Sequence, residues 1–370
     1  MENFVLPMYG GSSIVNLTST ILRNYGLYTE VKPLDSEPEL TTKIVLVLID
    51  GLGLNMLNNI GYGHLSNQSL TSVFPSTTST AISSLLTAST PGEHGLLGYI
   101  GYFKELGGLA NILRYSHPLA SERDMYKEFI DLKQITTAKS IFVSMLEKGV
   151  KSKIVIPREI TYSALSRFLH EGVEVQEYVM HWDGLISLKK LMHESVDFVY
   201  AYFPQIDTLA HIYGPNSKEV KMASRELLKD LLKIAKGKPK DVTVIITADH
   251  GHVEVGKIYK AIEDPELLNS LSMPPFGDSR AVFLKTKNNI SEIFKKKYAN
   301  FEVYTLQEII KLDLFGNFNE NYIDRVGDYI AIPKDNSIMI YPFKRGDERM
   351  LKSQHGGLLK DEMLVPLILL

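Results

Sequence analysis

Acidic residues and histidines directly follow two apolar segments of strand length. The run Val242–Thr247 leads to Asp249 and His250, and the run Ile44–Ile49 leads to Asp50. β-branched apolar runs of this length predict buried parallel strands, and α/β sheets place their chemistry at the carboxyl ends of such strands. A buried carboxylate beside an imidazole costs free energy unless something satisfies it, and a divalent metal would do so. Taken alone, Asp50 is explained equally well as a helix cap or an Asx turn.

Two further segments carry residues that could serve the same metal site. Asp207 and His211 lie four residues apart, which puts both side chains on one face of a helix and suits two ligands of one metal. An ion pair across one helical turn explains the same spacing. His355 precedes Gly356 and Gly357, which allow close backbone approach to a ligand. A turn with an incidental histidine is the simpler interpretation of that segment.

Hydroxyl residues occupy positions 77–80, after Pro75 and before the apolar, helix-like run Ala81–Leu86. Such residues at a helix start are usually N-caps, and we expect at least one of the four to be one. The free N–H groups and the positive dipole end of the same helix start would also suit a phosphate. The chain has no cysteine, so a nucleophile here would be a hydroxyl whose pKa a metal lowers.

The composition restricts the partners that these residues can serve. The 370 residues carry 40 Lys and Arg against 43 Asp and Glu, so no basic field indicates a nucleic-acid partner. The absence of cysteine excludes disulfides and leaves Asp, Glu and His as strong metal ligands. No apolar stretch approaches the ~20 residues that span a bilayer, and the start MENFVLPMYGGSS lacks a signal-peptide pattern. We therefore expect a cytoplasmic protein without a membrane partner, of open oligomeric state.

Predicted strands and helices alternate along most of the chain. Besides the two runs above, Lys153–Ile156 and Phe198–Tyr202 predict buried strands. Amphipathic stretches predict helices at Ala138–Lys148, Leu185–His193 and Ser217–Ala235. This alternation predicts an α/β fold with a doubly wound, mostly parallel central sheet and helices on both of its faces.

The pattern of the chain changes beyond Lys257. Short strand candidates lie among charged stretches there, at Ala281–Leu284, Asp328–Ile332 and Ile338–Ile340. We expect residues 273–350 to form a small α+β cap on a core of residues 1–272 and 351–370. The last strand of the core is expected at Leu364–Leu370.

Taken in order, the polar segments resemble the alkaline phosphatase superfamily. The series consists of a strand ending in Asp50, then FPSTT, Asp207-x-x-x-His211, Asp249-His250-Gly251 and His355-Gly356-Gly357. The similarity is closest to the type I phosphodiesterase/nucleotide pyrophosphatase family, over roughly residues 42–255 and 351–370. Each segment is weak evidence alone, whereas the five in this order are highly specific.

The resemblance implies a site with two divalent metal ions. Six ligand positions follow from the matched segments: Asp207, His211 and His355 for one ion, and Asp50, Asp249 and His250 for the other. Three imidazoles favour Zn²⁺, with Mn²⁺ or Fe²⁺ as alternatives. The nucleophile position falls on Thr78, with Thr77 one residue away as the alternative. By this resemblance Thr78 forms a covalent phosphothreonine, which water then hydrolyses.

The expected activity is hydrolysis of phosphodiester or nucleotide pyrophosphate bonds in a small-molecule substrate. Members with the sequence Thr-Phe-Pro-Asn hold the phosphate with that Asn, and here Ala81 stands in its place and cannot donate a hydrogen bond. The substrate preference is therefore not transferable, and a phosphomonoesterase or phosphonate hydrolase could use the same core. A catalytically retired metal-binding regulatory protein is the alternative from another class. The retained ligand and hydroxyl positions disfavour it.

Three other polar residues near these segments receive structural interpretations. We expect His252 to lie behind the ligands or in solvent, and His94 to stabilise a turn. Arg280 could reach a phosphate from the cap, but an ion pair between cap and core is the favoured interpretation.

Overall fold

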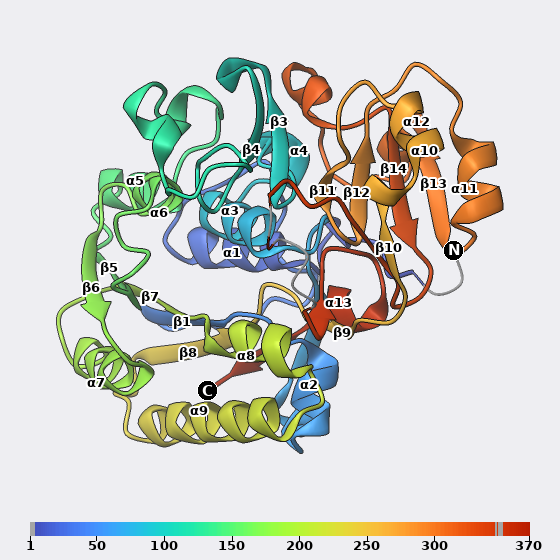
Figure 1. Ribbon diagram of the computed structural model, residues 1–370. Coiled ribbons are helices and arrows are strands. Elements are labelled where there is room, and N and C mark those ends of the chain that lie inside the picture. The colour runs from blue at the N-terminus through green and yellow to red at the C-terminus, as the bar shows by residue number, and fades with distance from the viewer. Residues whose placement is uncertain (1–3, 345, 347–350) are drawn as a thin grey trace.

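Four mostly apolar runs form the parallel centre of a seven-stranded sheet. They are β1 (Lys43–Ile49), β5 (Ser152–Pro157), β7 (Phe198–Phe203) and β8 (Val242–Thr247). These strands pair in parallel in the order β8-β1-β7-β5. All side chains of β1, β7 and β8 are buried because helices cover both faces of the sheet in this computed structural model (Figure 1). The structure describes residues 4–344, 346 and 351–370.

Three shorter strands complete the central sheet. β6 (Glu174–Tyr178) extends it in parallel beyond β5. β17 (Leu364–Leu369) pairs antiparallel with β8, and β2 (Gln68–Thr71) pairs antiparallel with β17. The full order is β2-β17-β8-β1-β7-β5-β6. The prediction of an α/β fold with a mostly parallel central sheet is confirmed, including the return of the chain for its last strand.

Helices pack against both faces of this sheet (Figure 1). One face carries α1 (Ile14–Asn24), α3 (Thr78–Thr87), α5 (Ile141–Glu147) and α6 (Ala164–Leu169). The other carries α2 (Leu54–Asn59), α7 (His181–Leu191), α8 (Gln205–Tyr213) and α9 (Lys218–Lys236). The three helices predicted from amphipathic stretches are α5, α7 and α9. In α5 the first helical residue is Ile141, because the Ser140 side chain accepts the N–H of Phe142 as an N-cap.

A second, antiparallel sheet of six strands lies beside the first (Figure 1). Its order is β13 (Phe301–Thr305), β14 (Tyr329–Pro333), β12 (Ala281–Leu284), β11 (Phe276–Asp278), β3 (Ile100–Phe103) and β4 (Gly108–Asn111). Strands β11 to β14 come from the predicted cap, whereas β3 and β4 come from a much earlier part of the chain. Gly277 opposite Ile100 joins the two groups. The division between a cap at 273–350 and a core stays a prediction, and residues 345 and 347–350 lie outside the described part.

Short elements connect the two sheets and their helices. They are the pairs β9 (Val253–Glu254) with β16 (Ser353–Gln354) and β10 (Ile258–Lys260) with β15 (Ile338–Ile340), and the helices α4 (Pro91–His94), α10 (Pro265–Ser270), α11 (Ser291–Lys297), α12 (Leu306–Lys311) and α13 (Lys360–Met363). The strand predicted at Ile338–Ile340 thus exists, but it pairs with β10 and not with the six-stranded sheet. No helix in the described part of the chain combines the length and apolar character that a membrane span needs.

A buried ion pair connects the turn between β11 and β12 to α13. Arg280 Nε donates to Glu362 Oε1 at 2.6 Å and Arg280 Nη2 donates to Glu362 Oε2 at 2.7 Å. Arg280 Nη1 donates to the carbonyls of Asp335 and Ser337. Both charged side chains are fully buried. Arg280 therefore forms the ion pair favoured from the sequence, between the predicted cap and the predicted core.

Candidate active site

Three strands deliver acidic residues to one edge of the central sheet. Asp50 follows β1, Asp249 follows β8, and Asp207 lies in the first turn of α8, just after β7. Because β7, β1 and β8 are parallel neighbours, their carboxyl ends meet, and the three carboxylates meet with them. Asp50 and Asp249 are only 2% and 0% exposed, so both belong to the protein interior.

Asp50, Asp249 and His250 form a buried cluster. His250 Nε2 lies 3.5 Å from Asp50 Oδ1 and 3.3 Å from Asp249 Oδ2. Burial and then the neighbouring Asp249 carboxylate raise the pKa of Asp50 well above its ordinary value. The Tyr202 hydroxyl donates to Asp50 Oδ2 and fixes the direction of that carboxylate. The geometry of the three residues could hold one metal ion.

Asp207, His211 and His355 form the second cluster. Asp207 Oδ1 lies 3.2 Å from His211 Nε2 and 3.5 Å from His355 Nε2. The two Nε2 atoms lie 3.2 Å apart. The structure therefore brings together the three side chains of each set that the sequence grouped, although they come from distant parts of the chain.

Backbone carbonyls fix the orientation of the histidines in both clusters. The Nδ1 atoms of His211, His250 and His355 lie 2.9, 3.1 and 3.1 Å from carbonyl oxygens. A carbonyl only accepts, so Nδ1 carries a proton, and in the neutral imidazole Nε2 then turns its lone pair toward the carboxylates. Burial lowers the pKa of His355 well below its ordinary value. Its imidazole is therefore neutral, which is the form that binds a metal.

Unsatisfied buried atoms indicate that these residues suit bound cations. Three buried atoms lack a hydrogen-bond partner among the residues that the structure describes: Asp207 Oδ1, Asp249 Oδ2 and His252 Nε2. Such atoms are rare in native proteins because leaving them unpaired costs free energy. Within the described residues, the ion pairs of the three aspartates are all with histidines. A mixed set of carboxylates and imidazoles without a neutralising Lys or Arg fits zinc or a similar ion.

His252 is buried against the second cluster and does not face solvent. It is 2% exposed, and its Nε2 lies 3.1 Å from Asp207 Oδ1, outside hydrogen-bond geometry. Its Nδ1 lies 3.0 Å from Ser353 Oγ. His252, Asp207 and His211 also form a group that could hold a metal. The sequence left its position open, because only the pairing of β9 with β16 brings Ser353 beside it.

Thr78 is the hydroxyl residue that contacts the first cluster. Its Oγ1 lies 3.1 Å from His250 Nε2 and 3.5 Å from Asp50 Oδ1. Thr77 occupies the N-cap position of α3, but its side chain makes no capping hydrogen bond. Its side chain instead lies beside the Asp278 carboxyl group. The expectation of an N-cap is thus met in position only, and Thr78 is the better-placed nucleophile of the two.

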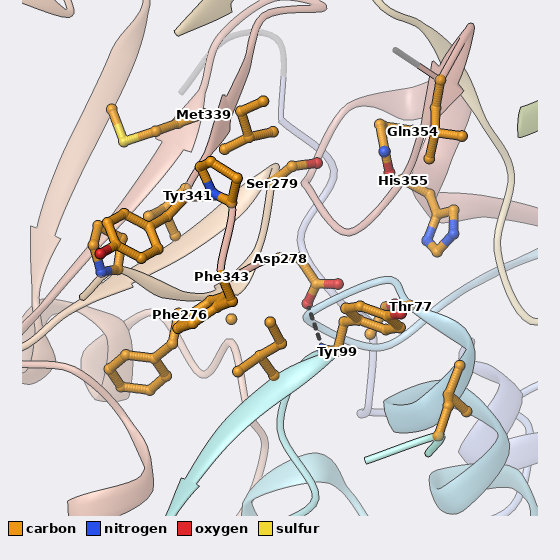
Figure 2. Close-up of a pocket in the computed structure, with 18 of the residues that line it drawn as sticks. Thr77, Tyr99, Phe276, Asp278, Ser279, Met339, Tyr341, Phe343, Gln354 and His355 are labelled. Atoms are coloured by element: carbon orange, nitrogen blue, oxygen red, sulfur yellow. Dashed lines mark hydrogen bonds between the residues drawn. The ribbon is translucent and has the colours of Figure 1, made fainter. Parts of the chain in front are cut away.

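A cavity of ≈480 Å³ opens above Thr78 and the second cluster. Thr78, Asp207, His211 and His355 line one side, and residues of β11 and the segment after β15 line the other. Figure 2 shows Tyr341, Phe343 and Phe276 on the far wall, with Asp278 between that wall and Thr77. The Tyr99 N–H donates to Asp278 Oδ2 at 3.2 Å, and burial raises the pKa of Asp278 to about 7. A small molecule in this cavity would touch Thr78 and the aromatic wall together.

His94 has the structural role expected from the sequence. Its Nδ1 accepts the N–H of Leu96 at 3.0 Å, and its Nε2 lies 2.9 Å from Ser84 Oγ. It therefore fixes the turn after α4 and ties that turn to α3, the helix that carries Thr78. Ala81 is fully buried in α3, so its methyl group offers a substrate nothing polar.

The mostly parallel sheet, with clusters of Asp and His at the carboxyl ends of its strands, forms an α/β fold that carries candidate metal-binding groups. The family model of type I phosphodiesterase/nucleotide pyrophosphatase matches residues 44–358. The chain belongs to this family, and it is an enzyme of the phosphoric ester hydrolase class. Among curated proteins, none matches this chain.

Solved structures share the fold at low sequence identity. Murine ectonucleotide pyrophosphatase/phosphodiesterase 5 is 16% identical with a TM-score of 0.64, covering 88% of this chain and 87% of that one. An inactive variant of the murine protein, solved with AMP, is 16% identical with a TM-score of 0.62, and the match covers 89% of this chain and 87% of that one. Phosphonoacetate hydrolase from Sinorhizobium meliloti 1021, solved with phosphonoacetate, is 17% identical with a TM-score of 0.63, and the match covers 90% of each chain. These similarities establish the fold.

Proposed function

We propose that this protein hydrolyses phosphodiester or nucleotide pyrophosphate bonds of a small molecule, with Thr78 as nucleophile and two bound divalent metal ions, zinc by preference. One observation carries the proposal. Thr78 Oγ1 lies 3.1 Å from His250 and 3.5 Å from Asp50, on the wall of the ≈480 Å³ cavity. A hydroxyl that contacts one ligand set and faces a cavity lined by the other is arranged for phosphoryl transfer.

The residues divide into ligands and a reacting group. Asp207, His211 and His355 would hold one ion, and Asp50, Asp249 and His250 the other. Bound ions would lower the pKa of a hydroxyl and neutralise charge on the phosphoryl oxygens. Thr78 Oγ gives its proton to water and bonds to phosphorus while the bond from phosphorus to the leaving oxygen breaks, and the leaving oxygen takes a proton from water as its group departs. Water then cleaves the phosphothreonine and restores the hydroxyl.

Substitution of Thr78 tests the proposal directly. Thr78→Ala is expected to lower kcat on bis-p-nitrophenyl phosphate by on the order of 10⁴-fold or more, because the attacking oxygen is gone. Thr78→Ser keeps an oxygen and should keep measurable turnover. Metal content, measured by plasma mass spectrometry, should stay at two ions per chain in both variants. Near-full activity of Thr78→Ala would show that another group attacks.

Phosphonate hydrolysis is the second candidate activity. The fold matches a phosphonoacetate hydrolase over 90% of both chains, with nearly the same TM-score as the phosphodiesterase relative. A panel of bis-p-nitrophenyl phosphate, p-nitrophenyl phosphate, a dinucleotide and phosphonoacetate separates the two activities and also tests a monoesterase. Release of phosphate from phosphonoacetate at a higher kcat/KM than that of any ester would favour the second candidate.

We also propose a cytoplasmic location, on the composition alone.

A further inference from the structure

A second, smaller cavity of ≈130 Å³ adjoins Thr78. Thr78 and Leu113 line both cavities, but this one extends toward β5, β7 and α6, whereas the larger one opens toward β11. Aliphatic side chains of Ile82, Ile156, Ile160, Leu165 and Leu169 form much of its wall, and the hydroxyl residues Ser163, Ser166 and Tyr202 complete it. Arg123 lies at its exposed edge, where Nη2 donates to the Leu113 carbonyl at 3.1 Å. The interior is therefore an apolar compartment next to the proposed nucleophile.

Two polar atoms among the residues that line this cavity have no hydrogen-bond partner within the described part of the chain. Tyr200 Oη and His170 Nδ1 are both buried and make no hydrogen bond. Tyr200 is 1% exposed, and the centres of the two rings lie 6.3 Å apart. Burial lowers the pKa of His170 to about 4, so its imidazole is neutral at pH 7 and one of its nitrogens accepts while the other donates. Unpartnered buried groups in an apolar cavity point to a guest that bonds to them.

We propose that this cavity binds one ester arm of a phosphodiester substrate, an uncharged ring-sized apolar group with a single hydrogen-bonding atom. The inference rests on the proposed function, because it places the phosphorus at Thr78. Both cavities meet there, and a diester has two arms where a monoester has one. The volume suits a single ring, since a cavity of ~150 Å³ takes up benzene. A nucleoside combines a base with a ribose and exceeds this volume, so a substrate with this arm is a phosphodiester and not a nucleotide pyrophosphate.

The arm in the smaller cavity is the one that stays on phosphorus. In an in-line displacement the leaving oxygen lies opposite the attacking Thr78 Oγ, and the water that follows attacks from that same side. Asp207, His211 and His355 line the larger cavity, and the smaller cavity contains none of them. The leaving arm therefore departs through the larger cavity, while Tyr200 and His170 contact the retained arm.

A series of p-nitrophenyl phosphodiesters tests the pocket through kinetics. The leaving group stays constant, and the retained arm is methyl, phenyl or 4-hydroxyphenyl. We expect kcat/KM for phenyl to exceed that for methyl by at least about tenfold. Ile160 is half-buried, and its substitution Ile160→Trp should fill the cavity with the larger side chain. The ratio of kcat/KM for phenyl to kcat/KM for methyl should then fall to about one. Ile186→Trp, on the exposed face of α7 at 56% exposure, should keep the wild-type ratio. A ratio that Ile160→Trp leaves unchanged overturns the assignment.

The unpartnered groups are tested separately. Tyr200→Phe keeps the volume and removes one hydroxyl, so it should lower the preference for 4-hydroxyphenyl over phenyl by about tenfold. An unchanged preference would mean that Tyr200 does not contact the arm.

Binding of a simple probe separates this inference from the proposed function. Phenol should bind to the metal-loaded wild-type protein in saturation-transfer NMR and lose its signal in Ile160→Trp. A crystal soaked with 4-bromophenol should show the bromine in this cavity. Water alone in the cavity at high phenol concentration overturns the pocket assignment, even if diesters are cleaved. If phenol binds in this cavity but the protein cleaves no diester, the pocket assignment holds and only the proposed function is contradicted.

Discussion

Ser353 connects two histidines at the candidate metal site. Its carbonyl lies 2.9 Å from His211 Nδ1, and its hydroxyl lies 3.0 Å from His252 Nδ1. His252 in turn reaches within 3.1 Å of Asp207. Groups behind the ligands orient them and tune metal affinity. One residue of a two-residue strand, β16, therefore sets the direction of a predicted ligand and of the imidazole beside Asp207.

His252→Asn should weaken binding of one of the two metal ions by about 10- to 100-fold, because it removes an imidazole that lies against Asp207 and belongs to a group that could hold the ion. Competition with a fluorescent chelator measures both affinities. His64→Asn, at an exposed position, serves as the control and should leave both unchanged. If the His252→Asn variant binds both metal ions with the affinities of the wild type, the role of His252 is packing alone.

Short elements hold the long ones in register around the site. α4 has four residues, yet His94 at its end bonds to Ser84 of α3 and to the N–H of Leu96. α13 is equally short, yet Glu362 holds Arg280 after β11 and accepts the N–H of Gly357, two residues beyond His355. The position of Thr78 and His355 therefore depends on buried polar contacts made by these short helices.

His94 should make the protein less stable in acid. Burial lowers its pKa to about 3, whereas the unfolded chain has the ordinary value of 6.5. As pH falls from 6.5 toward 3, the unfolded state gains a proton that the folded state excludes, so the free energy of unfolding falls. The loss is about 1.4 kcal/mol for each pH unit below 6.5. Urea unfolding at pH 7.5, 6 and 5 should show a smaller loss of unfolding free energy for His94→Gln than for wild type. Part of the loss should remain in the variant, because burial also lowers the pKa of His170 and of His252.

Glu362→Gln should cost about 3–5 kcal/mol of unfolding free energy, because it leaves the Arg280 charge buried without its counter-ion. Urea denaturation at pH 7.5 measures this loss. The exposed pair of Lys260 with Glu263 provides the control, and Glu263→Gln should change stability by less than about 1 kcal/mol. A small effect of Glu362→Gln would show that β11 and α13 are held together by other contacts.

The candidate site exists only in the fully folded molecule. Its ligands span positions 50 to 355, and they come from the ends of β1, β7 and β8 and from the segment after β16. Three aspartates are gathered there without a Lys or Arg ion-pair partner among the described residues. Bound cations should therefore stabilise the folded state as a whole.

Removal of metal should lower the melting temperature by several degrees. An ion at 1,000 times its Kd contributes about 4 kcal/mol to the folded state, provided that it does not bind the unfolded chain. Differential scanning calorimetry before and after dialysis against a chelator measures the shift, and added Zn²⁺ should restore it. Mg²⁺ added in place of Zn²⁺ should restore less, since imidazole favours the softer ion. An unchanged melting temperature would contradict resident metals.

Whereas the division of six ligands into two sets of three came from the family resemblance and stays a prediction, the sequence by itself determined the buried strands of the central sheet and the Asp and His residues at their ends. This was possible because β1, β7 and β8 are local apolar runs, and polar residues at their buried ends cost free energy unless they bind something. Thr78 came instead from the resemblance of the FPSTT segment to the family, and its role as nucleophile stays a prediction. The N-cap expectation was correct only for the position of Thr77, because a side chain bonds to whichever partner lies nearby in space.

Only the tertiary structure decided the rest. β3 and β4 join strands that follow them by more than 160 residues, as Gly277 opposite Ile100 shows. His252 lies against Asp207, and Thr78 separates two cavities of ≈480 and ≈130 Å³. These features depend on contacts between segments far apart in the chain, and hydrophobic periodicity carries information only about neighbours. The chemistry of the site was therefore readable in residue types, whereas the space around it, which selects the substrate, was settled by packing.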